Sequence, residues 1–326
     1  MPAFNSLLDA LDRKILFELD CDSRQSFSDL ARKVRHGRDT VEYRVERLIG
    51  RGIIRECTSM VNLYKLGLTI YKTYFHLRNE RERTKEFFQY VRAHPQVYRV
   101  AIYDGNWDIN VATVARTPRD FYEIHSKLIT KFHDIVLEYA MYTLIDVWRF
   151  RKGYFFNKAA PGILTGGEPE RIAIDQLEYT ILKHIASNSR ISLVELAEKT
   201  SSTPAVAKYR IEQLEKRGVI AGYRIEVSHK KLNMLYFKTQ LFVASYQQRM
   251  LKQLFDFCDQ NPHITYFISQ LGECPVELEL EVESLEQYHE IIDSLREKFS
   301  PFIQNFRSLL IHEEFFKWLP YEVTTE

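Results

Sequence analysis

The sequence predicts an α+β protein made of two repeats, each a winged helix-turn-helix followed by a ferredoxin-like βαββαβ domain. Residues 9–54 align with residues 175–220 without a gap, and 17 of the 46 positions are identical. Only about 3 identities would be expected by chance, so the chain contains an internal repeat. In each copy a helical hydrophobic period then gives way to shorter alternating runs, which favour strands.

These two patterns divide the chain of 326 residues into five stretches. We expect winged helices at residues 1–63 and 174–229, βαββαβ domains at residues 64–156 and 230–326, and a linker at residues 157–173. The linker is assigned because glycine and proline are concentrated there. The chain is long enough for each repeat to bury a core of its own.

Three helices are expected at the start of each winged helix. In the first copy, apolar residues recur at helical spacing over residues 9–20. Ser26 or Ser28 can cap a second helix that ends near Val34. Gly37 is expected to adopt the backbone conformation that the following tight turn requires.

The third helix is predicted from about residue 38 to residue 50, with Val41, Val45 and Leu48 on its buried side. It would serve as the recognition helix. Strand-forming residues follow at positions 53–61, and we expect them to form the wing.

The βαββαβ pattern then appears twice, and it predicts helices on one face of an antiparallel sheet. In the first copy the expected strands are 69–77, 97–103, 107–115 and 135–145, with helices at 80–93 and 118–130. In the second copy they are 235–245, 264–270, 276–282 and 302–311, with one helix ending at 258 and another at 285–299.

Composition excludes several classes of protein. No apolar run approaches the roughly 18 residues that a membrane span needs, and the first residues do not resemble a secretory signal, so we expect a cytoplasmic protein without membrane contact. The four cysteines form no C-x-x-C pair and predict reduced thiols. Because the ten histidines are scattered, we expect no metal, and we expect no other cofactor.

The net charge is only +1, but positive charge is concentrated in the helix-turn-helix segments. Residues 24–55 carry a net charge of +5 and the matching residues 190–221 carry +2. Long, positively charged side chains on a recognition helix can contact phosphates and base edges, so double-stranded DNA is the expected partner. The candidate contacts are His36, Arg38, Thr40, Arg44, Arg47 and Arg51 in the first copy and Ser202, Thr203, Lys208 and Arg210 in the second.

The alternative interpretation is that these side chains are ordinary solvated charges on a surface helix. It has more weight for the second copy, whose helix-turn-helix segment is less basic.

The chain resembles the Lrp/AsnC ("feast/famine") transcription regulators, and the resemblance covers nearly all of it, twice. The matching residues of the first copy are Leu11-Asp12-Arg13-Lys14-Ile15-Leu16, Ser23-Arg24, Leu30-Ala31, Val41-x-x-Arg44-Val45, Leu48 and Gly52-x-Ile54. The resemblance implies a regulator whose βαββαβ units, called RAM domains in that family, pair the DNA-binding units and form homo-oligomers. It implies no enzymatic activity, and a tandem copy departs from the usual single one.

The resemblance also implies a small-molecule effector, commonly an amino acid, near a Gly-x-x-Asp turn. That turn is matched by Gly105-Asn106-Trp107-Asp108, so Gly105, Trp107 and Asp108 are the candidate effector residues. A buried aspartate could hold an ammonium group, or it could merely close its own hairpin. The second copy has Gly272-Glu273-Cys274-Pro275 instead, which puts a second site in doubt.

One strand of the second copy is unusually acidic. Glu277, Glu279 and Glu281 alternate with apolar residues and would share one face. In the resembled family this sheet face packs against a partner sheet, so we hypothesise that the two halves pair, with Lys72 or Arg99 facing the glutamates. The alternative is a solvated acidic edge.

Two rival functions are considered. Siroheme decarboxylases resemble the same family and exist as fused pairs, but their His-Asn-Tyr-x-Arg stretch would fall near residues 97–101. There only Tyr98 and Arg99 hint at it, without its spacing. The other rival is an interaction module whose winged helices no longer bind DNA.

Overall fold

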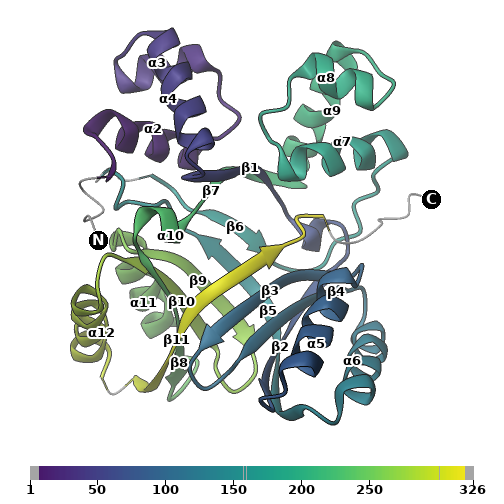
Figure 1. The fold of residues 1–326 in the computed structure, drawn as a ribbon, viewed down its shortest axis with the longest axis vertical. Helices are drawn as coiled ribbons and strands as arrows, with labels where there is room; N and C mark the ends of the chain where they lie inside the picture. The colour runs from purple at the N-terminus through teal and green to yellow at the C-terminus, as the bar shows by residue number, and fades with distance from the viewer. Residues whose placement is uncertain (1–6, 157, 159, 301, 320–326) are drawn as a thin grey trace.

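The computed structural model describes residues 7–156, 158, 160–300 and 302–319. Two helical lobes stand side by side on a β-structure that is flanked by helices (Figure 1). No helix among the described residues is long and apolar enough to cross a membrane.

The first lobe is a three-helix unit formed by α2 (Ala10–Cys21), α3 (Phe27–Val34) and α4 (Arg38–Gly50). Ser26 caps α3 by accepting a hydrogen bond from the amide of Asp29, as predicted for one of the two serines. The left-handed residue of the turn is Arg35, with φ of 58°, whereas Gly37 has φ of −64°, which any residue can adopt.

The second lobe repeats this arrangement with α7 (Gln176–Ser187), α8 (Leu193–Lys199) and α9 (Pro204–Lys216). Its left-handed turn residue is Ser201, with φ of 50°. The side chain of Thr203 caps the recognition helix α9 and Pro204 occupies its first turn, a position that needs no amide donor.

The strands that were expected to be wings join the two repeats instead. The strand β1 (Ile54–Val61) pairs antiparallel with β7 (Ile220–Val227), and Cys57 lies opposite Ile225. No hairpin wing forms from these residues, because their hydrogen-bonding partners come from the other repeat. The two helix-turn-helix units are therefore connected through one shared two-stranded sheet.

The strands of the two βαββαβ domains form one continuous sheet that closes on itself. In the first repeat they are β2 (Thr69–Leu77), β3 (Val97–Asp104), β4 (Ile109–Ala115) and β5 (Val136–Arg149). In the second they are β8 (Leu235–Val243), β9 (Ile264–Leu271), β10 (Val276–Val282) and β11 (Ile303–Phe316). Their order is β2-β4-β3-β11-β8-β10-β9-β5, and β5 pairs again with β2, so these eight strands close into a barrel.

Helices cover the outside of this barrel. They are α5 (Arg81–Ala93) and α6 (Pro118–Phe132) in the first repeat, and α11 (Gln248–Gln260) and α12 (Leu285–Phe299) in the second. Each pair packs on the apolar outer face of its own strands, for example through Phe87 and Phe132 in the first repeat.

The stretch expected as a linker contains a strand. The strand β6 (Ile163–Gly166) pairs with β5, and the backbone amide of Ile172 donates to the carbonyl of Lys65 in the short helix η1 (Leu63–Lys65). Residues 157–173 therefore include segments that pack on the first repeat rather than a simple spacer.

Each helical lobe lies over the βαββαβ domain of the other repeat (Figure 1). Ile225 and Val227 of β7, followed by Leu232 in α10 (His229–Leu232), share a core with α2, α3 and α4. Val61 and Leu63 of the first repeat correspondingly pack with α7, α8 and α9. Each helical lobe therefore packs against residues of the other repeat as well as its own.

The barrel interior confirms the hypothesis that the halves pair through charge. Lys72 forms an ion pair with Glu277, while Arg99 and Lys238 each lie 2.6 Å from Glu279. Burial alone would raise the pKa of Glu277, but Lys72 and Lys238 outweigh it and lower that pKa to about 2. The acidic strand is therefore an internal element rather than a solvated edge.

Candidate nucleic-acid interface

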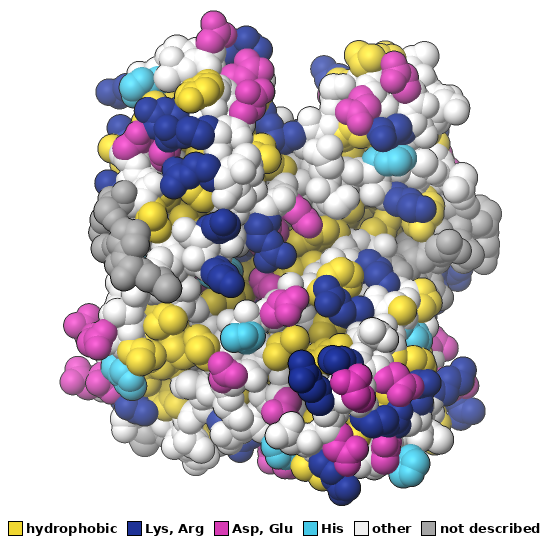
Figure 2. Space-filling model, in the orientation of Figure 1, with side chains coloured by type: hydrophobic (Ala, Val, Ile, Leu, Met, Phe, Trp, Pro, Cys, Tyr) yellow, Lys and Arg dark blue, Asp and Glu magenta, His cyan; other side chains and the backbone are white. Residues whose placement is uncertain are grey.

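The recognition helices α4 and α9 lie in the two lobes that project from the barrel (Figure 1). On the face shown in Figure 2, lysine and arginine gather more densely on the lobe of the first repeat than on that of the second. This agrees with the difference in charge between the two sequence segments.

The start of α4 presents polar and basic side chains to solvent. His36, Arg38 and Thr40 are all exposed. Arg38 forms exposed ion pairs with Asp39 at 3.2 Å and Glu42 at 3.0 Å. Such surface pairs contribute little to stability, so the guanidinium can exchange them for a base or a phosphate.

Two arginines expected on the outer side of α4 are turned toward α2 instead. Arg44 binds Asp9 and lies 3.1 Å from Asp12, and Arg47 lies 2.6 Å from Asp12. Their side chains are only 23% and 33% exposed. The hydrogen bond that Arg44 donates to the Asp9 carboxylate raises the pKa of Arg44 above its ordinary value. Both arginines therefore attach the recognition helix to the first helix, which corrects the prediction that they are free to read bases.

The second lobe contains the same attachment. Arg210, which is equivalent to Arg44, lies 2.8 Å from Asp175 and 3.5 Å from Glu178. Arg217 also binds Glu178. Arg51, which is equivalent to Arg217, remains exposed, and its nearest partner is the carbonyl of Leu7 at 3.5 Å.

The remaining candidates of the second lobe are divided between capping and solvent. Ser202 is bonded to Thr200, and Thr203 is occupied as the helix cap. Lys208 is exposed, with Glu212 at 3.9 Å. Exposed Ala205 and Val206 give the first turns of α9 an apolar character that α4 does not have.

One pair of exposed residues was missed by the sequence prediction. Tyr43 on α4 and Tyr209 on α9 occupy equivalent positions and are 62% and 56% exposed. Their identity between two diverged recognition helices was the available signal. A large exposed aromatic side chain at this place can contact sugar, phosphate or thymine methyl groups.

The two lobes also contact one another directly. The hydroxyl groups of Ser23 and Ser189, equivalent residues, are 2.6 Å apart. Arg190 donates to the carbonyl of Ser23 at 2.7 Å, and its counterpart Arg24 donates to the carbonyl of Ser189. These reciprocal hydrogen bonds hold the two recognition helices in one fixed relation.

Among the described residues, a fully buried ion pair joins the first lobe, and not the second, to the β1–β7 sheet. Asp20, near the end of α2, accepts hydrogen bonds from Arg224 of β7 at 2.8 and 2.9 Å. Both side chains are completely buried. The equivalent residues in the second lobe are Ala186 and Thr58, which cannot form this pair.

The turn expected to bind an effector packs against the other repeat. Gly105 has φ of +149°, and a Cβ there would lie 2.8 Å from Leu309. Trp107 is buried. Asp108 is not, since its side chain is 45% exposed and accepts hydrogen bonds from the amide of Leu77 at 2.7 Å and from His76. The premise of a buried aspartate is therefore wrong, although Asp108 remains accessible to a ligand.

Comparison with known proteins finds the duplicated helix-turn-helix. A family model described as winged helix-turn-helix DNA-binding matches residues 8–55 and 174–221. An HTH-type transcriptional regulator of Pyrococcus furiosus is 35% identical over 105 residues, which are 32% of this chain and 70% of that protein. The HTH-type transcriptional regulator LrpC of Bacillus subtilis is 26% identical over 140 residues, 43% of this chain and 93% of LrpC.

One solved structure resembles the whole tandem arrangement. The crystal structure of the siroheme decarboxylase NirDL has a TM-score of 0.63 at 14% sequence identity, and the match covers 95% of this chain and 93% of that chain. At this level of identity the likeness concerns the fold. Together with the regulators that match about half of the chain, the observations show that the chain belongs to the Lrp/AsnC family of DNA-binding transcription regulators, as an internally duplicated member.

Proposed function

We propose that one chain of this regulator binds an operator with two half-sites, using α4 for one and α9 for the other. The observation that carries this proposal is the pairing of both lobes within the chain, through the β1–β7 sheet and the Ser23–Ser189 contact. A pair of helix-turn-helix units in a fixed relation is the usual requirement for reading two half-sites.

The half-sites are proposed to be unequal. The first turns of α4 present Arg38 and Thr40, and arginine is the commonest reader of guanine. The first turns of α9 present Ala205 and Val206, which suit the methyl group of thymine. We therefore expect a guanine-containing half-site for the first repeat and a thymine-rich one for the second.

The direct test is binding of the purified chain to its own upstream DNA over a range of salt concentrations. Phosphate contacts release counterions, so the logarithm of affinity should fall linearly and steeply with the logarithm of salt. An interaction module that no longer binds DNA would show no such dependence with any fragment, and that result would contradict the proposal.

Tuning by a small molecule is the finer part of the proposal. Gly105, Trp107 and Asp108 remain the expected effector residues, and an ammonium group would compete with His76 and the amide of Leu77 for the Asp108 carboxylate. Asp108→Asn should then abolish any response of DNA binding to an amino-acid panel. Retention of the response would exclude this turn as the effector site.

The likeness of the fold to a siroheme decarboxylase favours a second candidate, a tetrapyrrole enzyme. Its carboxylate-binding groups would have to be free, yet Arg99 is paired with Glu279 and with Glu314 at 2.7 Å. Among the described residues, none that line the cavity beside Arg99 is a histidine. Titration with an iron porphyrin decides between the two functions, because a bound tetrapyrrole would produce a shifted Soret band and a regulator without a tetrapyrrole site would not.

A further inference from the structure

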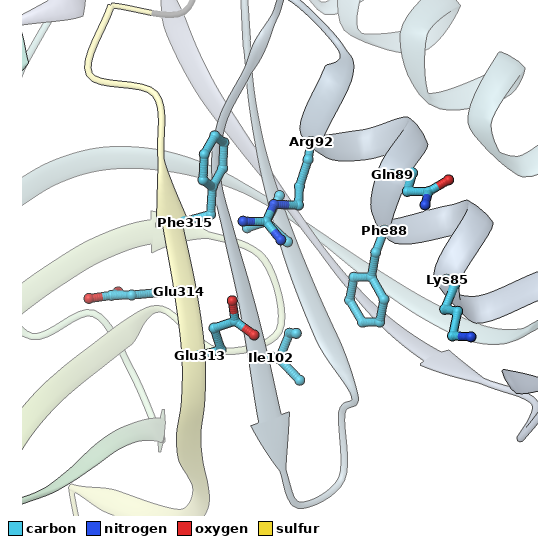
Figure 3. Close-up of a pocket in the computed structure, with 9 residues that line it drawn as sticks. Lys85, Phe88, Gln89, Arg92, Ile102, Glu313, Glu314 and Phe315 are labelled. Carbon is cyan, nitrogen blue, oxygen red and sulfur yellow. The ribbon is translucent and has the colours of Figure 1, made fainter. Parts of the chain in front are cut away.

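A pocket of about 220 Å³ lies on the outer side of the barrel, where α5 of the first repeat faces β11 of the second. In Figure 3, Arg92 and Phe88 project from α5, and Ile102, Glu313 and Phe315 reach toward them from the strands. Glu314 points away, toward its ion pair with Arg99. The walls thus come from both repeats, and this pocket is separate from the Gly105–Asp108 turn.

Arg92 is exposed and rests on an aromatic ring rather than on an anionic partner among the described residues. Its guanidinium carbon lies 4.8 Å from the centre of the Phe315 ring. No carboxylate of the described residues forms an ion pair with it. A guanidinium that rests on an aromatic ring keeps its N–H groups available, and its flat fork matches a carboxylate.

The floor of the pocket is apolar and its far rim is acidic. Phe88, Val100 and Ile102 form the floor. Glu313 is exposed on the rim, and among the residues described it has no ion-pair partner. Lys85 also lines the pocket, but it is paired with Glu82 at 2.8 Å. Glu313 would therefore repel a second negative charge on a ligand and favour a hydrogen-bond donor or a cation.

The equivalent place in the second repeat is filled. There the rings of Trp148, Phe255 and Phe267 pack together, with centroids 5.0 and 5.4 Å apart. Aligning α5 with α11 and β3 with β9 puts Asp259 at the place of Arg92 and Phe267 at the place of Val100. Both the space and the positive charge are therefore specific to the first repeat.

We propose that the α5–β11 pocket binds a small monocarboxylate with an apolar body, one molecule per chain. The carboxylate pairs with Arg92, and the apolar body lies on Phe88 and Ile102. This chemistry is shared by apolar amino acids and by carboxylic acids that lack an amine. Glu313 distinguishes them, because only the amino acid brings an ammonium group to that rim.

The experiment is calorimetric titration of the full chain with two matched pairs of probes, leucine with 4-methylpentanoate and phenylalanine with 3-phenylpropanoate. At least one member of a pair should bind. Arg92→Asp, which copies the second repeat, should weaken binding by roughly tenfold or more. Arg81→Asp, at the exposed start of the same helix, makes the same charge change outside the pocket and should leave affinity within about twofold.

Two further variants complete the test. Val100→Phe copies Phe267 and should block the pocket, but it changes a buried residue; Arg92→Asp keeps the test decisive if Val100→Phe does not fold. If the pocket recognises an amine, Glu313→Gln should weaken binding of leucine and phenylalanine but not of the two amine-free acids. If the pocket does not recognise an amine, Glu313→Gln should leave the affinity for the probes equal or higher.

The proposal is overturned if none of the four probes binds at millimolar concentration, or if Arg92→Asp binds as well as the wild type does. These outcomes do not depend on DNA. Failure of the proposed regulator function would appear separately, as wild-type protein that does not bind its upstream DNA with or without a probe.

Discussion

Strands β10 and β4 occupy equivalent places in the barrel, but β10 points Glu277, Glu279 and Glu281 inward and β4 has Asn110, Ala112 and Val114 at those positions. Their neighbours differ less, because Lys72 on β2 and Lys238 on β8 are equivalent residues and both are buried. Two first repeats facing each other would bury lysines without carboxylates. Two second repeats would bury an excess of glutamates. Only a mixed pair balances the charges, which explains why the repeats diverged within one chain.

The lobes differ in a related way. The first has the more basic helix-turn-helix segment, with a net charge of +5 against +2, and the buried Asp20–Arg224 anchor. The second has a more apolar start of its recognition helix, and Ala186 and Thr58 stand where that anchor would be. Duplication within one chain lets the two lobes differ in sequence, whereas the two lobes of a symmetric dimer are identical. The predictions below test this asymmetry.

The largest effect is expected from Glu277→Ala. It leaves Lys72 and Lys238 buried with less compensating charge, and breaking such a pair costs about 3–5 kcal/mol. The matched variant Asn110→Ala removes one hydrogen bond, to the carbonyl of Thr73, and should cost about 1 kcal/mol. Chemical denaturation measures both. Equal losses would mean that the acidic strand has no special role in pairing the repeats.

The same glutamate predicts a dependence of stability on acid. Burial opposes ionisation, but Lys72 and Lys238 dominate and lower the pKa of Glu277 to about 2, below its ordinary value of 4.5. Because the folded-state pKa is the lower one, this contribution is present above pH 4.5 and is lost as the pH falls toward 2. Wild type should therefore lose more stability over this range than Glu277→Gln does. Parallel curves would contradict the assignment.

In the DNA-binding lobes, Arg38→Ala and Lys208→Ala should have different consequences. If Arg38 reads a base, its loss costs about 1–3 kcal/mol and relaxes specificity in one half-site. Lys208 is expected to contact phosphate, so its loss should weaken binding to all sequences and reduce the salt slope by about 1. Affinity measured on operator variants at several salt concentrations separates the two effects. Identical behaviour would make the lobes equal readers.

The smallest effect is expected from Arg44→Ala and its counterpart Arg210→Ala. Because both residues attach a recognition helix to the preceding helix through partly exposed ion pairs, each should lower stability by about 0.5–1 kcal/mol. Neither should change the salt slope of DNA binding. A loss of affinity confined to particular bases would show instead that Arg44 leaves Asp9 and Asp12 to read DNA.

The helices, the strands and the duplication could be predicted from the sequence. The hydrophobic period and the turn residues are local signals, and the repeat is visible when the two halves are aligned. The helix at 38–50 and the strand at 276–282 were predicted with the bounds observed. The pairing of β1 with β7 could not be predicted. Strand-forming residues suit a wing hairpin and a strand shared between the repeats equally well. The sequestration of Arg44 by Asp9 and Asp12 was missed for a similar reason, since helical spacing gives a side chain's direction but not its partner on another helix.

If one chain supplies a pair of unequal DNA-binding units, footprinting of the operator and the stoichiometry of the complex should both show it. We expect one chain per operator, with two protected half-sites of different sequence, one containing guanine and the other rich in thymine. A perfect palindrome protected equally on both sides, or a complex in which each chain occupies a single half-site, would contradict it.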